Sequence, residues 1–584
     1  MIVSDEHRLP NSTRYLAPGK LIISRLIMAA QLSRLPNSSF QHGLARVVAT
    51  LVNSKTRLTR VQHQSPSRLL PIPSSLVASH GSQLISLSNY GGGMLQGDTS
   101  TVDVRVESGA QLGVVTQGPN RIYKNPSGED CETNMTINVE NGGLLVYAPD
   151  PCCMFKDSKY KQTVRIDCHS SSDLIWIDLF SAGRVHKGEV WEFDKLTTRT
   201  TLYVDEKRVL VDAIRINGQL VSPIDTNMSV FGTVLLHGNR GAQIAKLLDF
   251  TARQLAAQHT SIRGDFPSGM NSLNLGGRFD LGVSQVGPET HVIRLAAQQA
   301  EDVYRVLHSA LQPLKSTFGV EIYKDRIQSN HSSKIVKGKS KQRKQNLKNS
   351  AAVDSNLSCA ASTMSWSSYL LVDSALPTGA FAHSSGIEAA SQLDLLDSPE
   401  SVENFVLAST QSNMQLLSPF VRESHSLVNL PSDVFQKWKH LDQQLHVLLV
   451  TNRPALRASL DQGEALLRVA RSLLPQNLLF KEIKQHVTSD TGHFGALFGI
   501  IAKELGITTP EEVCRVLQYC LARDVVSAAV RLNLVGPLAG LSILRKASQV
   551  DYEQLTMDTA AGSSPMLEVV QPHHDILTMR LFRT

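Results

Sequence analysis

A stretch of side chains that could bind an ion occupies residues 181–191. His186 and Glu189 lie close together within it, beside Arg184. Imidazole and carboxylate groups both suit nickel, so either side chain could hold a transition metal. The alternative is a solvated loop in which Arg184 and Glu189 form a structural ion pair, and such a loop is the more frequent arrangement.

A glycine-rich segment offers a second candidate. Gly91, Gly92 and Gly93 are consecutive, and Gly97 and Asp98 follow. Consecutive glycines permit positive φ angles or a close approach of another backbone. The plain interpretation is a sharp turn between strands in which Asp98 bonds to its own loop. The alternative is a carboxylate that lines a polar passage.

A histidine motif lies in the second half of the chain. His383 follows the turn that contains Pro377 and Gly379, and Ser384 comes next. A lone histidine in this setting is more often a core or helix-start residue than a metal ligand. Ser384 does not lie in a G-x-S-x-G elbow, so the sequence does not favour a hydrolase.

The other candidates for metal or nucleotide chemistry are weaker. His573 and His574 are adjacent, and adjacent helical residues point in different directions. Residues 338–340 resemble the end of a phosphate-binding loop, but Ser333 stands where that loop needs glycine. We therefore expect a scaffold protein with no bound cofactor, not an enzyme.

The cysteines indicate a reducing compartment. There are seven, and none forms a C-x-x-C pair, which argues against a disulfide framework or a closed zinc site. We expect a cytoplasmic protein. Cys152 and Cys153 could bind nickel as thiolates, although burial in a core is the more frequent role of such side chains.

Length and charge limit the protein class. A chain of 584 residues is expected to form two to four domains. The net charge is +6, but residues 331–349 contain seven Lys or Arg and no acidic residue. The rest is close to neutral, so nucleic acid is not the expected partner. No apolar run approaches the ~20 residues of a membrane span.

Hydrophobic periodicity divides the chain into two unlike halves. Between residues 44 and 240 apolar and polar residues alternate, as at 102–107, which predicts many short strands in a layered, sandwich or barrel arrangement. Asn141 and Gly142 form a strong hairpin signal. Helical patterns follow at 242–258 and 296–314.

The second half has a helical period. A linker at 327–363, rich in Ser, Lys, Asn and Gln, is expected to be disordered. Beyond it we expect an all-α bundle of eight to ten helices. Thr509 is placed to cap one of these helices, with Glu512 reaching back to it, and Gly506 to end the helix before it.

The order of motifs in the first half resembles the urease accessory protein family UreD, also called UreH. The resemblance covers roughly residues 44–326. It is carried by these residues: Tyr90, Gly91, Gly92, Gly93, Gly97, Asp98, Thr116, Gln117, Gly118, Ile122, Tyr123, Lys124, Pro149, Asp150, Pro151, Phe155, Lys156, Asp157, Tyr160, Gln162, Gly183, Arg184, Gly188, Glu189 and Trp191.

The second half resembles the urease accessory protein family UreF over residues 366–584. The resemblance is carried by residues 373–384 and by Gly386, Glu388, Asn452, Arg457, Ser459, Gln462, Gly463, Arg531, Leu532, Gly536, Pro537, Leu538 and the closing Arg580, Leu581, Phe582, Arg583 and Thr584. Ser385 stands where an aromatic or hydrophobic residue is usual, and Thr584 where serine is common.

Together the resemblances predict a fusion of four segments. We expect a disordered extension at 1–43, a mainly-β layered UreD-like domain with two helices at 44–326, a basic linker at 327–363 and an all-α UreF-like domain at 364–584. A linker of this length allows the halves to pair within one chain or between chains, and it raises their local concentration.

The resemblance also implies a function. UreD and UreF proteins dock on apo-urease and recruit the GTPase UreG, and nickel then passes transiently to the urease active site. It implies polar passages, for which Asp98, Glu189 and His186 are the candidates. Phe381, His383 and the stretch around Arg580 and Phe582 are expected to pack together near an interface with UreD, UreG or a second UreF-like half.

One alternative function remains open from the sequence. The basic segment at 331–349 could make the chain a binder of nucleic acid or of an anionic surface, with no role in metal delivery.

Overall fold

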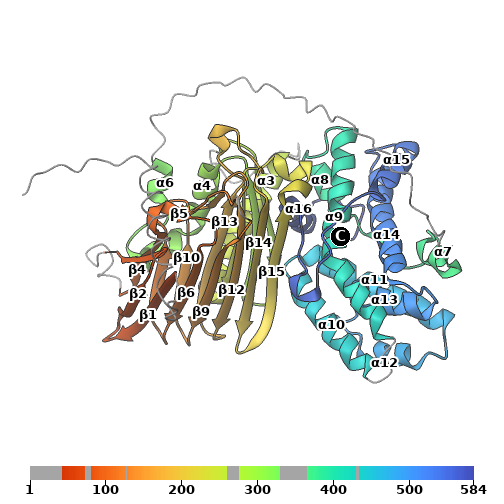
Figure 1. Ribbon diagram of the computed structural model, residues 1–584, viewed down its shortest axis with the longest axis horizontal. Coiled ribbons are helices and arrows are strands. Elements are labelled where there is room, and N and C mark those ends of the chain that lie inside the picture. The colour runs from red at the N-terminus through yellow and green to blue at the C-terminus, as the bar shows by residue number, and fades with distance from the viewer. Residues whose placement is uncertain (1–42, 73–80, 126–127, 260–274, 329–364, 429–432) are drawn as a thin grey trace, which may run out of the picture.

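A computed structural model describes most of the chain (Figure 1). The residues it describes are 43–72, 81–125, 128–259, 275–328, 365–428 and 433–584. A β-rich half and a helical half lie side by side (Figure 1). The expected extension at 1–43 and linker at 327–363 lie almost entirely outside the described residues, so both stay predictions.

Two sheets lie against each other in the β-rich half. Neighbouring strands of the first sheet are, in order, β15 (Lys207–Asn217), β14 (Lys195–Val204), β12 (Lys159–Cys168), β9 (Cys131–Val139), β6 (Thr99–Val106), β1 (Leu44–Val52) and β2 (Lys55–His63). Those of the second are β17 (Phe279–Gln285), β18 (Thr290–Ala297), β16 (Val230–His237), β13 (Asp173–Ser181), β10 (Leu144–Ala148), β7 (Gln111–Val115), β4 (Gln83–Asn89) and β3 (Ser67–Pro71), with the short strands β5 (Gly93–Met94), β8 (Arg121–Ile122) and β11 (Cys152–Met154) beside them.

The chain winds between the two sheets as in a solenoid. Strands β6, β9, β12 and β14 are parallel neighbours in one sheet, and β4, β7, β10 and β13 in the other. The alternating apolar side chains face inward, so that Val104 of β6 and Leu112 of β7 belong to one buried core. The predicted layered β structure is confirmed.

The predicted hairpin at Asn141 and Gly142 is wrong. These residues join β9 to β10, which belong to different sheets and pair in parallel with other strands. Gly142 does have a positive φ of 64°, as a tight turn requires. The turn signal therefore located the reversal of the chain, but it carries no information about which sheet the next strand joins.

Helices cover the outer face of the second sheet. Leu248 of α3 and Val303 of α4 share a core with Ile175 and Ile293 of the sheet. The predicted helix at 296–314 begins late, because Ala296 pairs with Phe231 in the ladder between β18 and β16. The helices of this half are α2 (Pro223–Thr226), α3 (Gly238–His259), α4 (Ala300–Ala310), α5 (Lys315–Phe318) and α6 (Lys324–Gln328).

The described part of the second half is helical, which confirms the predicted all-α bundle. Phe420, Trp438 and Leu497 lie in its core. The helices are α7 (Trp366–Val372), α8 (Ile387–Gln392), α9 (Pro399–Leu427), α10 (Val434–Leu449), α11 (Arg453–Leu473), α12 (Leu478–His486), α13 (Phe494–Glu504), α14 (Pro510–Arg531), α15 (Pro537–Ala547) and α16 (Pro565–His573). Short 3-10 turns occur in both halves. Those of the β-rich half are η1 (Tyr90–Gly92), η2 (Val185–Lys187), η3 (Gly218–Leu220) and η4 (Gln312–Leu314), and those of the helical half are η5 (Ala380–Ala382), η6 (Met557–Thr559) and η7 (His574–Ile576).

Helix α14 begins where the sequence predicts, but one contact differs. The Thr509 hydroxyl accepts a hydrogen bond from the backbone N–H of Glu512 at 3.3 Å, as an N-cap does. The Glu512 carboxylate does not return to Thr509. It accepts instead from the Ser368 hydroxyl at 2.6 Å and from the Ser365 backbone N–H at 3.1 Å, and so ties the start of α7 to α14.

Helix α16 of the second half packs against β17 and β18 of the first. Phe231 and Ala296 share a hydrophobic core with Val569, so apolar burial holds the halves together. Gly282 of β17 makes the close approach possible. A Cβ atom at this position would lie 2.5 Å from the carbonyl oxygen of Val569.

We predict that Gly282→Ala weakens the contact between the halves. The added methyl group must displace the α16 backbone, which should cost about 1–3 kcal/mol of unfolding free energy. Thermal unfolding of the full chain measures this. The control is Gly287→Ala, because a Cβ at Gly287 meets nothing within 4 Å. Equal melting temperatures for the two variants would contradict the prediction.

Candidate functional site

A cavity of approximately 340 Å³ lies between the two sheets. Three residues of the glycine-rich and Gln-Gly motifs, Gly92, Gln117 and Gly118, line it. Side chains from both sheets complete the wall, including the polar groups of Asp150, Tyr160, Gln162 and Asp178 and the thiol of Cys152. Burial raises the pKa of the Cys152 thiol well above its usual value, so it remains protonated.

Asp150 fixes one wall of this cavity. Its buried carboxylate accepts hydrogen bonds from the Thr116 hydroxyl at 2.8 Å and the Tyr304 hydroxyl at 2.8 Å. The guanidinium of Arg326 donates to it at 2.7 Å. Asp150 therefore ties α4 and α6 to the loop after β7, so this residue of the Pro-Asp-Pro stretch has a structural role.

Asp178 of β13 lines the same cavity. The side-chain amide of Gln162 donates to its carboxylate at 2.6 Å. Burial, reinforced by the nearby carboxylate of Asp212, raises the pKa of Asp178 to about 7. This group can therefore carry either a proton or a negative charge near neutral pH.

A second, much smaller cavity of approximately 10 Å³ adjoins Asp178. Asp212 and Thr233 also line it. Both bind the guanidinium of Arg294, whose Nη2 lies 2.5 Å from Asp212 Oδ1 and whose Nη1 lies 2.6 Å from Thr233 Oγ1. Arg294 is only 4% exposed, so it is a charge buried inside the protein.

The polar groups continue from Arg294 into the helical half. Glu568 of α16 places Oε2 4.0 Å from Arg294 Nη2, and the amide of Asn452 donates to the same oxygen at 3.1 Å. Asn452 also donates to Gln571 at 2.6 Å, and Gln571 donates to the carbonyl of Ser385 at 3.2 Å. We refer to this series as the polar row: Asp178, Asp212, Arg294, Glu568, Asn452 and Gln571.

The polar row ends at a cavity of approximately 80 Å³ in the helical half. Gln571 lines it together with Ser385, Gly386, Gln462 and Thr584 of the UreF-like motifs. The polar row therefore joins a cavity lined by motif residues of the first half to one lined by motif residues of the second.

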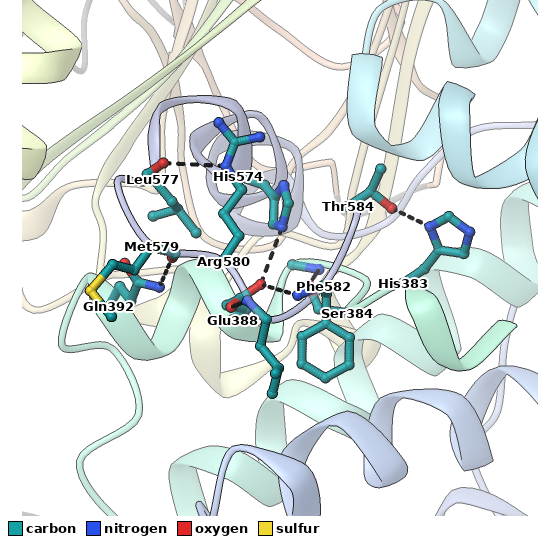
Figure 2. Close-up of polar contacts among 12 residues, drawn as sticks. His383, Ser384, Glu388, Gln392, His574, Leu577, Met579, Arg580, Phe582 and Thr584 are labelled. Carbon is teal, nitrogen blue, oxygen red and sulfur yellow. Dashed lines mark hydrogen bonds and ion pairs between the residues drawn. The ribbon is translucent and has the colours of Figure 1, made fainter. Parts of the chain in front are cut away.

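The last residues of the chain pack against the histidine motif, as expected (Figure 2). The Thr584 hydroxyl lies 2.6 Å from Nδ1 of His383, and the backbone N–H of Ser384 donates to the Thr584 oxygen at 2.5 Å. Burial lowers the pKa of His383 to about 4, so the ring is neutral at physiological pH. His383 thus serves as a packing and hydrogen-bonding residue.

Glu388 of α8 anchors the same segment. Its buried carboxylate accepts from the backbone N–H groups of Leu581 at 2.5 Å and Phe582 at 3.2 Å, and it lies 3.2 Å from Nε2 of His574 (Figure 2). His573 instead places Nδ1 2.9 Å from the carbonyl of Val569. The two histidines thus have different partners, as adjacent positions require.

Two candidates for the polar passage have other contacts. Asp98 accepts a hydrogen bond from the Leu95 backbone N–H at 2.8 Å, within its own loop. Glu189 forms an ion pair with Arg184, whose Nε donates at 2.8 Å. The Asp98 contact matches the interpretation as a turn between strands, and the Glu189 contact matches the structural ion pair. Neither residue is among those that line the cavities. The side chain of His186 lies outside the described residues, and metal binding by all three stays a prediction.

Other motif residues shape the site. The guanidinium of Arg523 lies 5.0 Å from the ring centroid of Phe381, and that of Arg531 lies 4.6 Å from that of Phe582. Arg580 donates to the carbonyl of Asp575 at 2.9 Å.

Small residues in the motifs set backbone paths. A Cβ at Gly463 would lie 2.0 Å from the Gly492 oxygen, so only glycine permits α11 to lie this close to that loop. Gly379, two residues after Pro377, has a φ of 72° at the start of η5. Gly91 and Gly92 also have positive φ, whereas Gly93 is extended.

Sequence reasoning did not identify the charged centre of the polar row. Asp212 and Arg294 lie on strands, and Glu568 lies on a helix that the sequence analysis did not single out. A usable signal did exist, because Arg294 interrupts an apolar run in β18 and a buried charge needs a partner. The sequence does not reveal which partner the fold supplies.

Two structural features are absent from the described part of the chain. No group of three or more His, Cys, Asp or Glu side chains there is arranged to hold a metal ion. No helix among the described residues is long and apolar enough to cross a membrane. The basic segment at 331–349 lies outside the described residues.

We predict that Asp178→Asn makes stability less dependent on pH. The pKa of Asp178 is raised in the folded state, so the group favours folding most at low pH and this contribution is lost as pH rises from about 4 to about 7. As pH rises from 5 to 8, the melting temperature should therefore fall less in the variant than in the unmodified chain. The control is Asp551→Asn at an exposed position. A fall equal to that of the unmodified chain would contradict the prediction.

Comparison with known proteins matches each half to a separate family. The family described as UreD urease accessory protein matches residues 41–329. The family described as UreF matches residues 396–548. Neither match indicates a catalytic family.

Named relatives agree with this division. Urease accessory protein F of Arabidopsis thaliana is 37% identical over 236 residues, which cover 39% of this chain and 95% of the relative. Urease accessory protein D of the same plant is 25% identical over 291 residues, which cover 48% of this chain and 98% of the relative. Urease accessory protein UreD of Anaeromyxobacter sp. is 32% identical over 182 residues, which cover 31% of this chain and 59% of the relative. The chain belongs to the urease accessory proteins, with a UreD-family domain and a UreF-family domain joined in one polypeptide.

Proposed function

We propose that this chain is a scaffold for urease maturation that binds apo-urease in the cytoplasm, recruits a UreG-type GTPase and guides nickel toward the urease active site. Membership of the UreD and UreF families supports the role in maturation. The polar row carries the more specific proposal, because it connects the motif-lined cavities of the two halves through the protein interior.

The chemistry of the polar row suits an ion in transit. Carboxylate and amide oxygens can bind nickel, and the groups of the row lie along a path instead of around a point. An ion can therefore exchange one set of partners for the next. The nickel ion is cargo in this proposal and not a resident cofactor.

The segment at the end of the chain supplies a surface for the GTPase. Glu388 holds its backbone and His383 contacts the Thr584 hydroxyl, while the side chains of Met579 and Leu581 are 73% and 56% exposed. Exposed apolar side chains on a firmly held backbone are typical of a protein interface. A homodimer through the helical half, and pairing of halves between two chains, stay predictions.

The overall proposal is tested in cells that lack both accessory factors. The chain is produced together with apo-urease, the GTPase and nickel, and urea cleavage is assayed. We expect the intact chain to restore ureolysis. Catalytically inactive urease with normal levels of all four components would overturn the proposal.

The GTPase surface has its own test. We predict that the double variant Met579→Ser, Leu581→Ser retains at least tenfold less GTPase in a pull-down, because the lost contacts are apolar side chains at an interface. Leu478→Ser is the matched control, since Leu478 is 75% exposed on α12. Equal recovery of the GTPase by the double variant and the control would contradict this assignment.

A further inference from the structure

Arg294 is the only cation of the polar row and lies where the two halves meet. Its neighbours Asp212 and Thr233 come from the β-rich half, and Glu568 comes from α16 of the helical half. The guanidinium therefore stands between two carboxylates on the path that the proposed function requires a nickel ion to take.

The contacts of Arg294 are unequal. Its Nη2 lies 2.5 Å from Asp212 but 4.0 Å from Glu568. Its Nε is buried and has no hydrogen-bond partner among the described residues. An unsatisfied buried donor costs stability, so the position of Nε is an unfavourable part of this arrangement.

We propose that Arg294 closes the polar row to metal cations by occupying, with its guanidinium, the carboxylate pair that a divalent cation would bind. This inference rests on the proposed function, since it assigns a gate to the nickel path. A divalent cation and a guanidinium repel each other strongly in a buried site, so both cannot occupy the pair together. Passage then requires Arg294 to leave Glu568.

The geometry indicates which side opens. Arg294 is held firmly by Asp212 and Thr233 of its own half, and Glu568 is held by Asn452 of the other half at 3.1 Å. The 4.0 Å gap between Arg294 and Glu568 is therefore the longest of these contacts. A partner that shifts α16 relative to the sheet would free Glu568 to bind the ion.

Replacing the charge tests this gate directly. The full chain is purified as the unmodified protein and as Arg294→Gln, Arg294→Lys and the double variant Arg294→Gln, Glu568→Gln. Nickel chloride uptake is measured by equilibrium dialysis. We expect Arg294→Gln to bind one more nickel ion per chain than the unmodified protein. Arg294→Lys keeps the positive charge, and the double variant lacks one carboxylate, so neither should gain the ion.

The outcomes separate the gate from a purely structural ion pair. Equal nickel uptake by Arg294→Gln and the unmodified chain would overturn the inference, and so would an equal gain in the double variant. Folding is followed by thermal unfolding with and without nickel, since a bound ion stabilises the folded state. An Arg294→Gln chain that folds only with nickel supports the gate, and one that stays unfolded at every nickel concentration contradicts it.

The dialysis result is independent of urease. A chain that fails to restore ureolysis although its Arg294→Gln variant gains the ion would overturn the proposed function and still support the cation site. Restored ureolysis without any gain of nickel in the variant would overturn only the gate.

Discussion

The carboxylate of Asp225, in the β-rich half, caps helix α16 of the helical half. It accepts from the Ser564 hydroxyl at 3.0 Å and from the Met566 backbone N–H at 2.9 Å. This contact fixes where α16 begins relative to the sheet. The start of the helix in turn determines which groups its later side chains can reach. Along α16, Glu568 reaches the charged centre of the polar row and Gln571 reaches the histidine motif.

The position of α16 also determines where the last residues of the chain lie. His574 follows the helix and lies 3.2 Å from Glu388, which holds the backbone of the closing residues. One helix therefore links the contact between the halves, the interior polar groups and the exposed segment that we assign to the GTPase. A displacement of α16 would therefore change the contacts of all three.

The sequence predicted the elements better than their long-range partners. Periodicity identified the strands around Val104, and capping residues such as Thr509 located helix starts, because both are local properties. The sheet that each strand joins depends on contacts between distant residues, so the turn at Gly142 was misassigned. The same limit applies to the site. Asp98 and Glu189 stood out in motifs, whereas Asp212 and Arg294 become neighbours only through folding.

The covered edge of strand β15 has a further consequence. Gly562 of the helical half forms a parallel bridge with Ile214, and the Arg215 backbone N–H donates to the Gly562 oxygen at 3.0 Å. Those groups would otherwise offer hydrogen bonds to any extended polypeptide nearby. Tethering the covering segment to the same molecule gives it a high effective concentration at this edge once the whole chain has been made. Every finished copy of the sheet thereby carries its own edge cover, whereas separately synthesised subunits must meet by diffusion before one covers the other.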